Sequence, residues 1–172
     1  MDFSLPPRVE EYRLRVRAFV DEHILPLETD KSLLSDHENV REDVVQRIQA
    51  LSKAEGLWAL QMPRARGGAE LGFVGMAACY EEAARSPLGP VMFNAAPPDD
   101  GNMMLLDKVL STEALKEQWL KPLIDGKVRS AFAMTEPDGG CGSDPSLTYT
   151  RATKVGSAWR IHGRKWFITG AQ

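Results

Sequence analysis

The feature of this 172-residue sequence that most constrains its fold is a change in the spacing of apolar residues near Lys127. Before that residue, apolar side chains recur every three or four positions, as they do along one face of a helix. After it, β-branched and aromatic residues replace these helical stripes, which is typical of strands. The sequence therefore predicts a mainly α-helical domain over 1–128, followed by an antiparallel β-region over 129–172.

Five helices are expected in the first region. Their apolar stripes fall within residues 7–28, 39–55, 73–85, 103–110 and 112–126. Gly56 and Gly126 are placed to end the second and the fifth, because glycine adopts the left-handed conformation that closes many helices. Thr112 has the side chain of a good N-cap for the fifth helix, in which Trp119 and Leu123 are expected to share the apolar face.

Three runs in the second region predict strands, at 130–135, 146–155 and 157–170. The turn signal at 156–158 indicates that the last two runs pair as an antiparallel hairpin. A three-stranded sheet of this kind leaves edges and a face uncovered, so we expect a sheet that is unfinished within this chain. Its uncovered apolar residues are expected to favour oligomers or aggregates. These residues are Trp159, Ile161, Trp166 and Ile168.

The composition argues against several classes of protein. The formal net charge is −3, so no basic field favours a nucleic-acid partner. Acids and arginines occupy the N-terminal positions where a secretory signal has its apolar core. The longest apolar stretch, 73–80, is far shorter than the ~20 residues that a membrane-spanning helix needs. We expect a globular protein without a membrane span.

The two cysteines, Cys79 and Cys141, have neither the spacing of metal ligands nor a secretory context. Reduced thiols and no metal site are therefore expected. Cys79 lies on the apolar stripe of the third expected helix, which begins with Phe73 and Val74, and is interpreted as a small core residue. Cys141 is flanked by glycines that would expose it, but no basic side chain is adjacent to activate it. An inert loop thiol is the preferred interpretation.

Two segments of the second region could carry chemistry. The glycines of Thr135–Asp144 would let backbone N–H groups approach a phosphate, with Ser143 adding a hydroxyl. The alternative is a plain connection whose aspartates make turns. Lys165–Gln172 could hold an aromatic ring against a planar cofactor while Thr169 donates a hydrogen bond to its edge. The alternative is a half-buried strand with ordinary core aromatics, and the residues alone leave both choices open.

Taken together, these motifs form a familiar pattern. The run FAMTEP, then GSD, then GRKWFITG, behind an all-helical segment, resembles the acyl-CoA dehydrogenase family, whose members carry a TEP..GSD loop and a strand ending in a K.WIT-like motif. The runs FNAAPPDDGNMMLL and EALKEQWLKPLIDGKVRSAFAMTEPD are most similar to the branch of family members 10 and 11. The resemblance covers nearly the whole chain, and residues 1–40 are the least distinctive part.

The resemblance implies a fold of three domains around FAD: an N-terminal helical domain, a middle β-domain and a C-terminal helical domain. It implies that 1–128 is the first of these, that 129–172 begins the second, and that the C-terminal helical domain is absent from this chain. The family's catalytic glutamate removes the α-proton of an acyl-CoA thioester while the β-hydride goes to flavin N5. That glutamate belongs to the C-terminal domain, so no catalytic residue is expected here and this fragment alone is expected to be inactive.

For the complete enzyme the resemblance implies a flavoprotein of fatty acid β-oxidation. Its substrate would be an acyl-CoA, its electron acceptor an electron-transfer flavoprotein, and its assembly a homo-oligomer. The implied location is the cytoplasm for a bacterial-type protein, or mitochondria or peroxisomes for a eukaryotic one. The rival interpretations are a non-catalytic truncated homologue that acts as a helical binding or assembly module, and part of an acyl-CoA oxidase.

The resemblance also implies the residues of an FAD site. The Thr135 hydroxyl and neighbouring main-chain groups would meet the pyrimidine edge, and Ser143 would approach the pyrophosphate and border the acyl-CoA passage. Phe167 would pack on the isoalloxazine, with Thr169 near N5 and O4. This chain has four residues, Asp138–Cys141, between TEP and GSD, more than the family pattern, so the resemblance does not define the path of this loop. The implied cofactor-binding set is Phe132, Ala133, Met134, Thr135, Gly142, Ser143, Phe167, Ile168 and Thr169.

Overall fold

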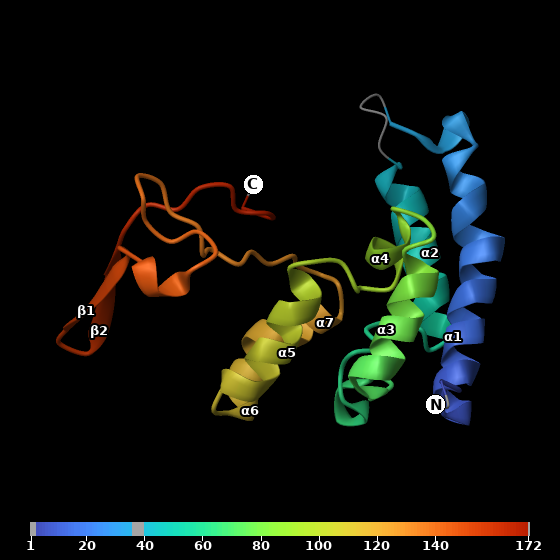
Figure 1. The fold of residues 1–172 in the computed structure, drawn as a ribbon, viewed down its shortest axis with the longest axis horizontal. Coiled ribbons are helices and arrows are strands. Elements are labelled where there is room, and N and C mark those ends of the chain that lie inside the picture. The colour runs from blue at the N-terminus through green and yellow to red at the C-terminus, as the bar shows by residue number, and fades with distance from the viewer. Residues whose placement is uncertain (1–2, 36–39, 172) are drawn as a thin grey trace. The chain divides into compact units, whose positions relative to one another are not determined.

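The computed structural model describes residues 3–35 and 40–171. The chain forms two compact units, called here the helical unit (Met1–Lys127) and the β unit (Val128–Gln172). The helical unit contains all the α-helices, and the β unit contains one antiparallel pair of strands among the residues described (Figure 1). This confirms the expected fold class, a mainly α chain in which helices precede an antiparallel sheet.

Three long helices and their extensions build the first part of the helical unit. Pro7 opens the first helix, where its fixed φ and missing N–H both suit a helix start. Gly56 follows the second helix with a φ of +66°, which is the left-handed stop predicted for it. The start expected at Asn39 lies outside the described residues, and the second helix begins at Glu42. The elements are α1 (Pro7–Phe19), a π-helical turn (Val20–Ile24), two 3-10 turns (Leu25–Glu28 and Lys31–Leu33), α2 (Glu42–Ala54), a 3-10 turn (Arg64–Arg66) and α3 (Gly72–Ala83).

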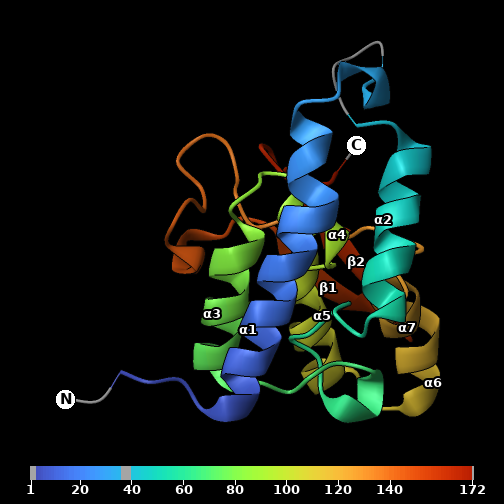
Figure 2. The same ribbon diagram turned by 90° about the vertical axis from the view of Figure 1, so that its right-hand side faces the viewer.

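α1 packs lengthwise against α3 (Figures 1 and 2). Gly75 leaves room at this contact, because a Cβ at this position would lie 2.6 Å from Cβ of Leu71 and 3.1 Å from Cγ2 of Val9. Cys79 is buried in the core beside these helices, as predicted, and burial raises the pKa of its thiol to about 11. The larger side chains of this core include Val16, Phe19, Val20, Ile24, Ile48, Leu57 and Phe93.

The apolar face predicted for α3 differs from the face that it buries. Phe73 is 83% exposed and Val74 is also exposed, whereas Cys79 and Ala83 face the core. The reason is the tight packing on α1, which selects the small residues of the helix. Trp119 is likewise exposed, so it does not share the buried face of Leu123 as expected.

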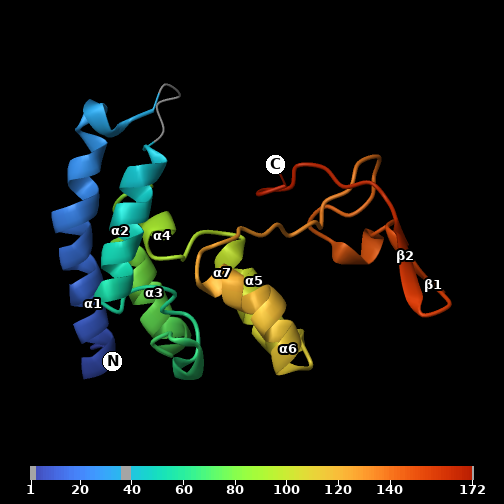
Figure 3. The ribbon, with the colours of Figure 1, turned by 180° about the vertical axis from the view of Figure 1, so that it is seen from behind.

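A second group of helices follows, with α5 lying beside α7 (Figure 3). Thr112 caps this region as predicted, because its hydroxyl accepts a hydrogen bond of 3.3 Å from the backbone N–H of Leu115. Met103, Leu120 and Leu123 are fully buried together in a second, smaller core. The elements are α4 (Gly89–Met92), α5 (Asp99–Val109), α6 (Glu113–Leu115), a π-helical turn (Lys116–Leu120) and α7 (Lys121–Ile124).

Asn94 links the two cores. It has a φ of +54°, in the left-handed region where asparagine is among the better tolerated residues. Its buried amide Nδ2 donates hydrogen bonds of 3.1 Å to the carbonyl oxygens of Leu123 and Ile124. The backbone carbonyl oxygen of Asn94 accepts a bond of 2.9 Å from Nε2 of Gln61. One side chain thereby ties the end of α7 to the segment that follows α4.

The β unit contains the predicted hairpin. β1 (Arg151–Val155) pairs antiparallel with β2 (Ala158–His162), from Arg151 opposite His162 to Val155 opposite Ala158. Gly156 supplies the turn with a φ of +60°. The expected third strand is wrong, because 130–135 and 165–170 form no regular strand. Phe167 has a φ of +51°, which interrupts extended backbone in the second of these segments.

We expect the isolated chain to self-associate, because several large apolar side chains of the β unit lie open to solvent. Sedimentation velocity should show species larger than a monomer, with a population that rises with protein concentration. Trp159→Ser and Ile161→Ser on β2 should reduce this association. A compact monomer at all concentrations would contradict the expectation. The exposed residues are Trp159, Ile161, Trp166 and Phe167.

Candidate functional site

The candidate site is organised around the carboxylate of Glu136, which is only 5% exposed. Four donors bond to it: the backbone N–H groups of Tyr149 (2.5 Å) and Thr150 (2.8 Å), the Thr150 hydroxyl (2.5 Å) and the Lys165 ammonium (2.9 Å). A buried charge is tolerated when it is paired and fully hydrogen-bonded in this way. Glu136 therefore joins the start of the loop to the approach to β1 and to the segment after β2.

These contacts stabilise the ionised form of Glu136. The hydrogen bond from the Thr150 hydroxyl has the largest effect, opposed by burial and reinforced by Lys165 and the two backbone N–H groups. The net result holds the pKa of Glu136 well below its ordinary value. Glu136 is thus a structural anion at neutral pH.

Lys165 connects the two motifs a second time. Its ammonium also donates a 2.8 Å hydrogen bond to the carbonyl oxygen of Met134. Next to it, the N–H of Trp166 donates a 3.2 Å bond to the carbonyl oxygen of Thr135. The segment just before Glu136 is consequently held against the segment that begins at Lys165.

The same two segments touch again farther along. A Cβ on Gly170 would lie only 2.4 Å from the carbonyl oxygen of Ser130, so glycine is required for this approach. Since Thr135 lies beside Trp166 and Ser130 beside Gly170, the segments 130–135 and 166–170 run side by side in opposite directions. Without a regular ladder of hydrogen bonds, they are neighbours but not paired strands.

This arrangement brings together most of the residues predicted for the flavin site. Phe132, Ala133, Met134 and Thr135 lie on one segment, and Phe167, Ile168 and Thr169 lie on its neighbour. The two aromatic side chains are open to solvent, Phe132 at 54% and Phe167 at 83%. Gly142 and Ser143 lie in the loop outside this pair of segments, and both are exposed.

The loop between the motifs has a compact path of its own. The N–H of Glu136 donates a 2.7 Å hydrogen bond to the carbonyl oxygen of Cys141, which closes the loop. Cys141 is fully buried, so the expectation that neighbouring glycines expose its thiol is wrong. Asp144 accepts a 2.9 Å bond from the N–H of Ser146 and caps a 3-10 turn, Pro145–Leu147. The Asp144 carboxylate thus stabilises a turn, as expected if the aspartates of this segment make turns.

Sequence reasoning missed the pairing of Glu136 with Lys165. Both residues stand inside the quoted motifs, in TEP and in GRKWFITG, and the available signal was a single acid in the first motif with two adjacent bases, Arg164 and Lys165, in the second. Spacing alone gives no reason to pair residues so far apart in the chain.

Comparison with known proteins decides the family. A model of the acyl-CoA dehydrogenase N-terminal domain matches residues 6–127. The chain belongs to the acyl-CoA dehydrogenase family. Acyl-CoA dehydrogenase family member 11 of Gallus gallus is 34% identical over 168 residues, which are 94% of this chain and 21% of that protein. The probable acyl-CoA dehydrogenase FadE2 of Mycobacterium tuberculosis is 33% identical over 175 residues, which cover 99% of this chain and 42% of FadE2.

A solved acyl-CoA dehydrogenase structure from Mycobacterium abscessus has the same fold, with a TM-score of 0.81 and 35% identity. The match covers 98% of this chain and 44% of that one. The present chain thus spans less than half the length of these acyl-CoA dehydrogenases. In the part of the chain that the structure describes, no helix is both long and apolar enough to cross a membrane.

Proposed function

We propose that this chain is the N-terminal portion of an FAD-dependent acyl-CoA dehydrogenase, which introduces an α,β double bond into an acyl-CoA thioester. The observation that supports this most directly is the side-by-side placement of the TEP segment and the segment that begins at Lys165. It gathers the aromatic and hydroxyl side chains that the family resemblance assigns to the flavin.

The residues present fit a flavin. A flavin needs a flat apolar wall and a few donors at its polar edge. Phe132 and Phe167 are exposed aromatic side chains on neighbouring segments, and Thr135 and Thr169 add hydroxyl groups to the same pair of segments. We propose that Gly142 and Ser143 offer backbone and hydroxyl donors to the pyrophosphate, and that Ser143 also borders the acyl-CoA passage.

Bound FAD would supply the hydride-accepting chemistry, and the chain's own residues would hold its ring in place. The hydroxyl groups of Thr135 and Thr169 would donate hydrogen bonds to the flavin's polar atoms. Phe167 would pack on the isoalloxazine face and keep water from it. Glu136 and Lys165 touch no substrate, and they act by holding these residues together.

The proton-abstracting base is proposed to lie outside these 172 residues. Glu136 is the carboxylate nearest to Thr135 in the sequence, but four hydrogen bonds occupy it and its pKa is held low. A general base needs free access to the proton that it removes and a pKa closer to the working pH. Glu136 meets neither condition.

This view predicts that the 172-residue chain binds FAD weakly and does not oxidise acyl-CoA. Loss of a general base costs ~10²–10⁴-fold in rate, and poor positioning adds further losses. Extending the chain with the remainder of the β-domain and the C-terminal domain of a family relative should yield yellow, FAD-bound protein that reduces a dye with an acyl-CoA. Rapid acyl-CoA-dependent bleaching of flavin by the 172-residue chain alone would overturn the assignment of the base.

Within the extended protein, Thr169→Ala should slow flavin reduction by about 10-fold or more, because a donor near the reacting flavin atoms is lost. Thr153→Ala is the matched control, since Thr153 is an exposed threonine on β1. Stopped-flow absorbance at the flavin band measures both variants. A folded extended protein that neither binds FAD nor reduces dye would favour a non-catalytic binding module instead.

For the complete enzyme we further propose an acyl-CoA of fatty acid β-oxidation as substrate and an electron-transfer flavoprotein as acceptor. We also propose that it assembles as a homo-oligomer. The exposed apolar residues of the β unit support the last of these proposals.

A further inference from the structure

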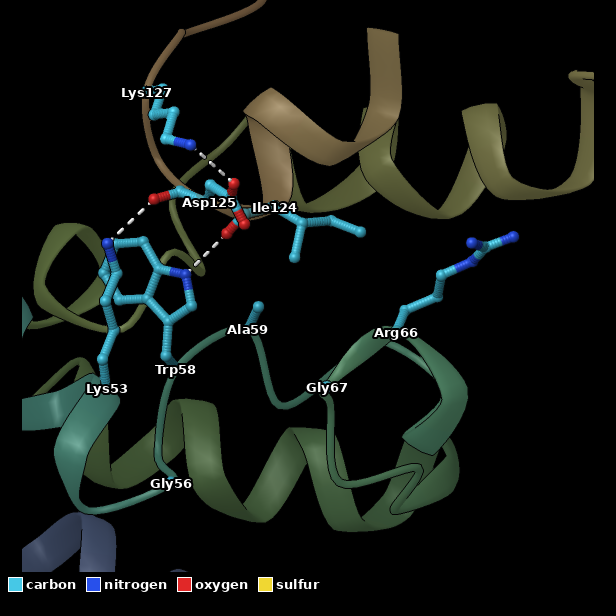
Figure 4. A pocket seen from close by; sticks show the side chains of 9 residues that line it. All are labelled: Lys53, Gly56, Trp58, Ala59, Arg66, Gly67, Ile124, Asp125 and Lys127. Atoms are coloured by element: carbon cyan, nitrogen blue, oxygen red, sulfur yellow. Dashed lines mark hydrogen bonds and ion pairs between the residues drawn. The ribbon is translucent and has the colours of Figure 1, made fainter. Parts of the chain in front are cut away.

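The helical unit has a cavity of about 410 Å³ that the proposed dehydrogenase chemistry does not use (Figure 4). It lies between the C-terminal end of α2, the loop that follows α2, and the end of α7. Trp58, Ala59 and Ile124 give it apolar walls, and Lys53, Arg66 and Lys127 are the basic residues around it. A volume in the range of ~300–1,000 Å³ with apolar walls and a few polar groups is typical of sites for small molecules.

Its walls are held in place by specific contacts. The indole Nε1 of Trp58 donates a 2.6 Å hydrogen bond to the carbonyl oxygen of Ile124. The ammonium of Lys53 lies 4.3 Å from the centre of the Trp58 ring and donates a 2.8 Å bond to the carbonyl oxygen of Asp125. Gly126 is required beside them, because a Cβ there would lie 2.6 Å from the Trp58 ring. The position of Lys53 at the cavity is therefore built into the fold.

The cavity carries a surplus of positive charge. Its carboxylate, Asp125, is neutralised by Lys127 at 3.0 Å and by Lys121 at 3.2 Å. Burial alone would raise the pKa of Asp125, but these two lysines outweigh it and lower the pKa. Lys53 pairs with no carboxylate among the residues that the structure describes. At the other end of the cavity, the guanidinium of Arg66 is paired with Asp107 at 3.2 Å and with Glu113 at 2.9 Å, so the surplus lies at the lysines. This surplus stands in a chain whose formal net charge is −3.

The ammonium groups of Lys53 and Lys127 both bond to Asp125. Lys53 bonds to the backbone oxygen of Asp125 and Lys127 to its side chain, as the dashed lines in Figure 4 show. An adjoining hollow shares Arg66 and Asp125 and adds Lys116 and Lys121 to its lining. Two ammonium groups bound to the same residue at the lining of an apolar cavity suit a compact dianion attached to an apolar body.

We propose that this cavity binds a small organic phosphate. The phosphate lies at Lys53 and Lys127, and its apolar or aromatic body lies against Trp58, Ala59 and Ile124. A phosphate monoester carries about −1.5 to −2 charges at neutral pH, which matches two ammonium groups better than a single carboxylate does. The site belongs to the helical unit alone and is independent of the proposed flavin site.

Phenyl phosphate is a suitable probe, titrated into the full 172-residue chain and followed by calorimetry and by the indole N–H signal of Trp58 in NMR spectra. Trp58→Phe assigns that signal. We expect saturable binding with a Kd below about 1 mM, weaker at high salt because charges are screened. Phenol, which lacks the phosphate, should bind at least about 10-fold more weakly, and inorganic phosphate should also bind more weakly than phenyl phosphate.

Lys53→Met and Lys127→Met should each weaken phenyl phosphate binding by about 10-fold, while Lys31→Met, a control at an exposed lysine in another part of the unit, should not. Circular dichroism checks that each variant folds. Lys127 is exposed, so Lys127→Met tests the site even if Lys53→Met, which loses contacts to Trp58 and Asp125, fails to fold. The proposal is overturned if no probe saturates the Trp58 signal by about 10 mM, or if both lysine variants bind as well as the original chain.

Discussion

Replacing Lys165 with methionine is expected to open the β unit while the helical unit stays folded. The substitution removes a charge partner from the buried Glu136 carboxylate and a hydrogen bond from the Met134 carbonyl oxygen. Breaking a buried pair by removing one partner is strongly destabilising, by about 3–5 kcal/mol, because the remaining charge has lost its compensation. The site's two segments should then separate.

Hydrogen exchange read by mass spectrometry measures this change segment by segment. Peptides from 130–136 and 163–170 should lose protection by at least about 10-fold, and peptides from α1 and α3 should keep theirs. Lys154→Met on β1 is the matched control, because Lys154 is an exposed lysine of the same unit. Equal protection in Lys165→Met and in the original chain would show that the buried pair does not hold the segments together.

The lowered pKa of Glu136 also predicts how the stability of the β unit changes in acid. Its pKa in the folded chain lies below the ordinary value of 4.5, so the ionised carboxylate stabilises the fold fully above that pH. The stabilisation is lost as the pH falls from about 4.5 through the lower folded-state pKa, because protonation then favours the unfolded chain. Glu136→Gln should be less stable at neutral pH and should lack this part of the acid dependence. An unchanged pH profile in that variant would contradict the role given to Glu136.

Asn94→Ala is expected to lower the free energy of unfolding of the helical unit by about 2–4 kcal/mol. Two buried carbonyl oxygens, those of Leu123 and Ile124, lose their donor, which costs about 1–3 kcal/mol. Alanine is also disfavoured at the positive φ of this position, which adds about 1 kcal/mol. Urea denaturation followed by circular dichroism measures the loss.

Asn94→Gly separates the two contributions, because glycine accepts the positive φ but carries no amide. It should restore only the backbone part of the stability. Gln46→Ala is the control, since Gln46 lies exposed on α2 and bonds only to neighbouring Glu42 among the described residues. If Asn94→Ala is as stable as Gln46→Ala, the link between the two cores is not important for folding.

The sequence alone determined the features that depend on neighbouring residues. Apolar spacing located the longer helices and the change to strands near Lys127, but it gave no sign of α4. Cap and turn chemistry placed Thr112, Gly56 and Gly156 correctly, because these conformations depend on one or two residues at a time. The TEP and GSD motifs were also readable in the linear order, and with them the family.

Only the tertiary structure decided the features that depend on contacts distant in sequence. Packing of α3 on α1 left Phe73 in solvent and buried Cys79, because close helix contact admits only small side chains at the interface. Segments 130–135 and 165–170 have strand-like composition, yet a strand exists only where a partner completes its hydrogen bonds. The pairing of Glu136 with Lys165 likewise depends on tertiary structure, because a carboxylate needs a cation only once folding has buried it. The spacing of neighbouring residues does not indicate which carboxylates will be buried.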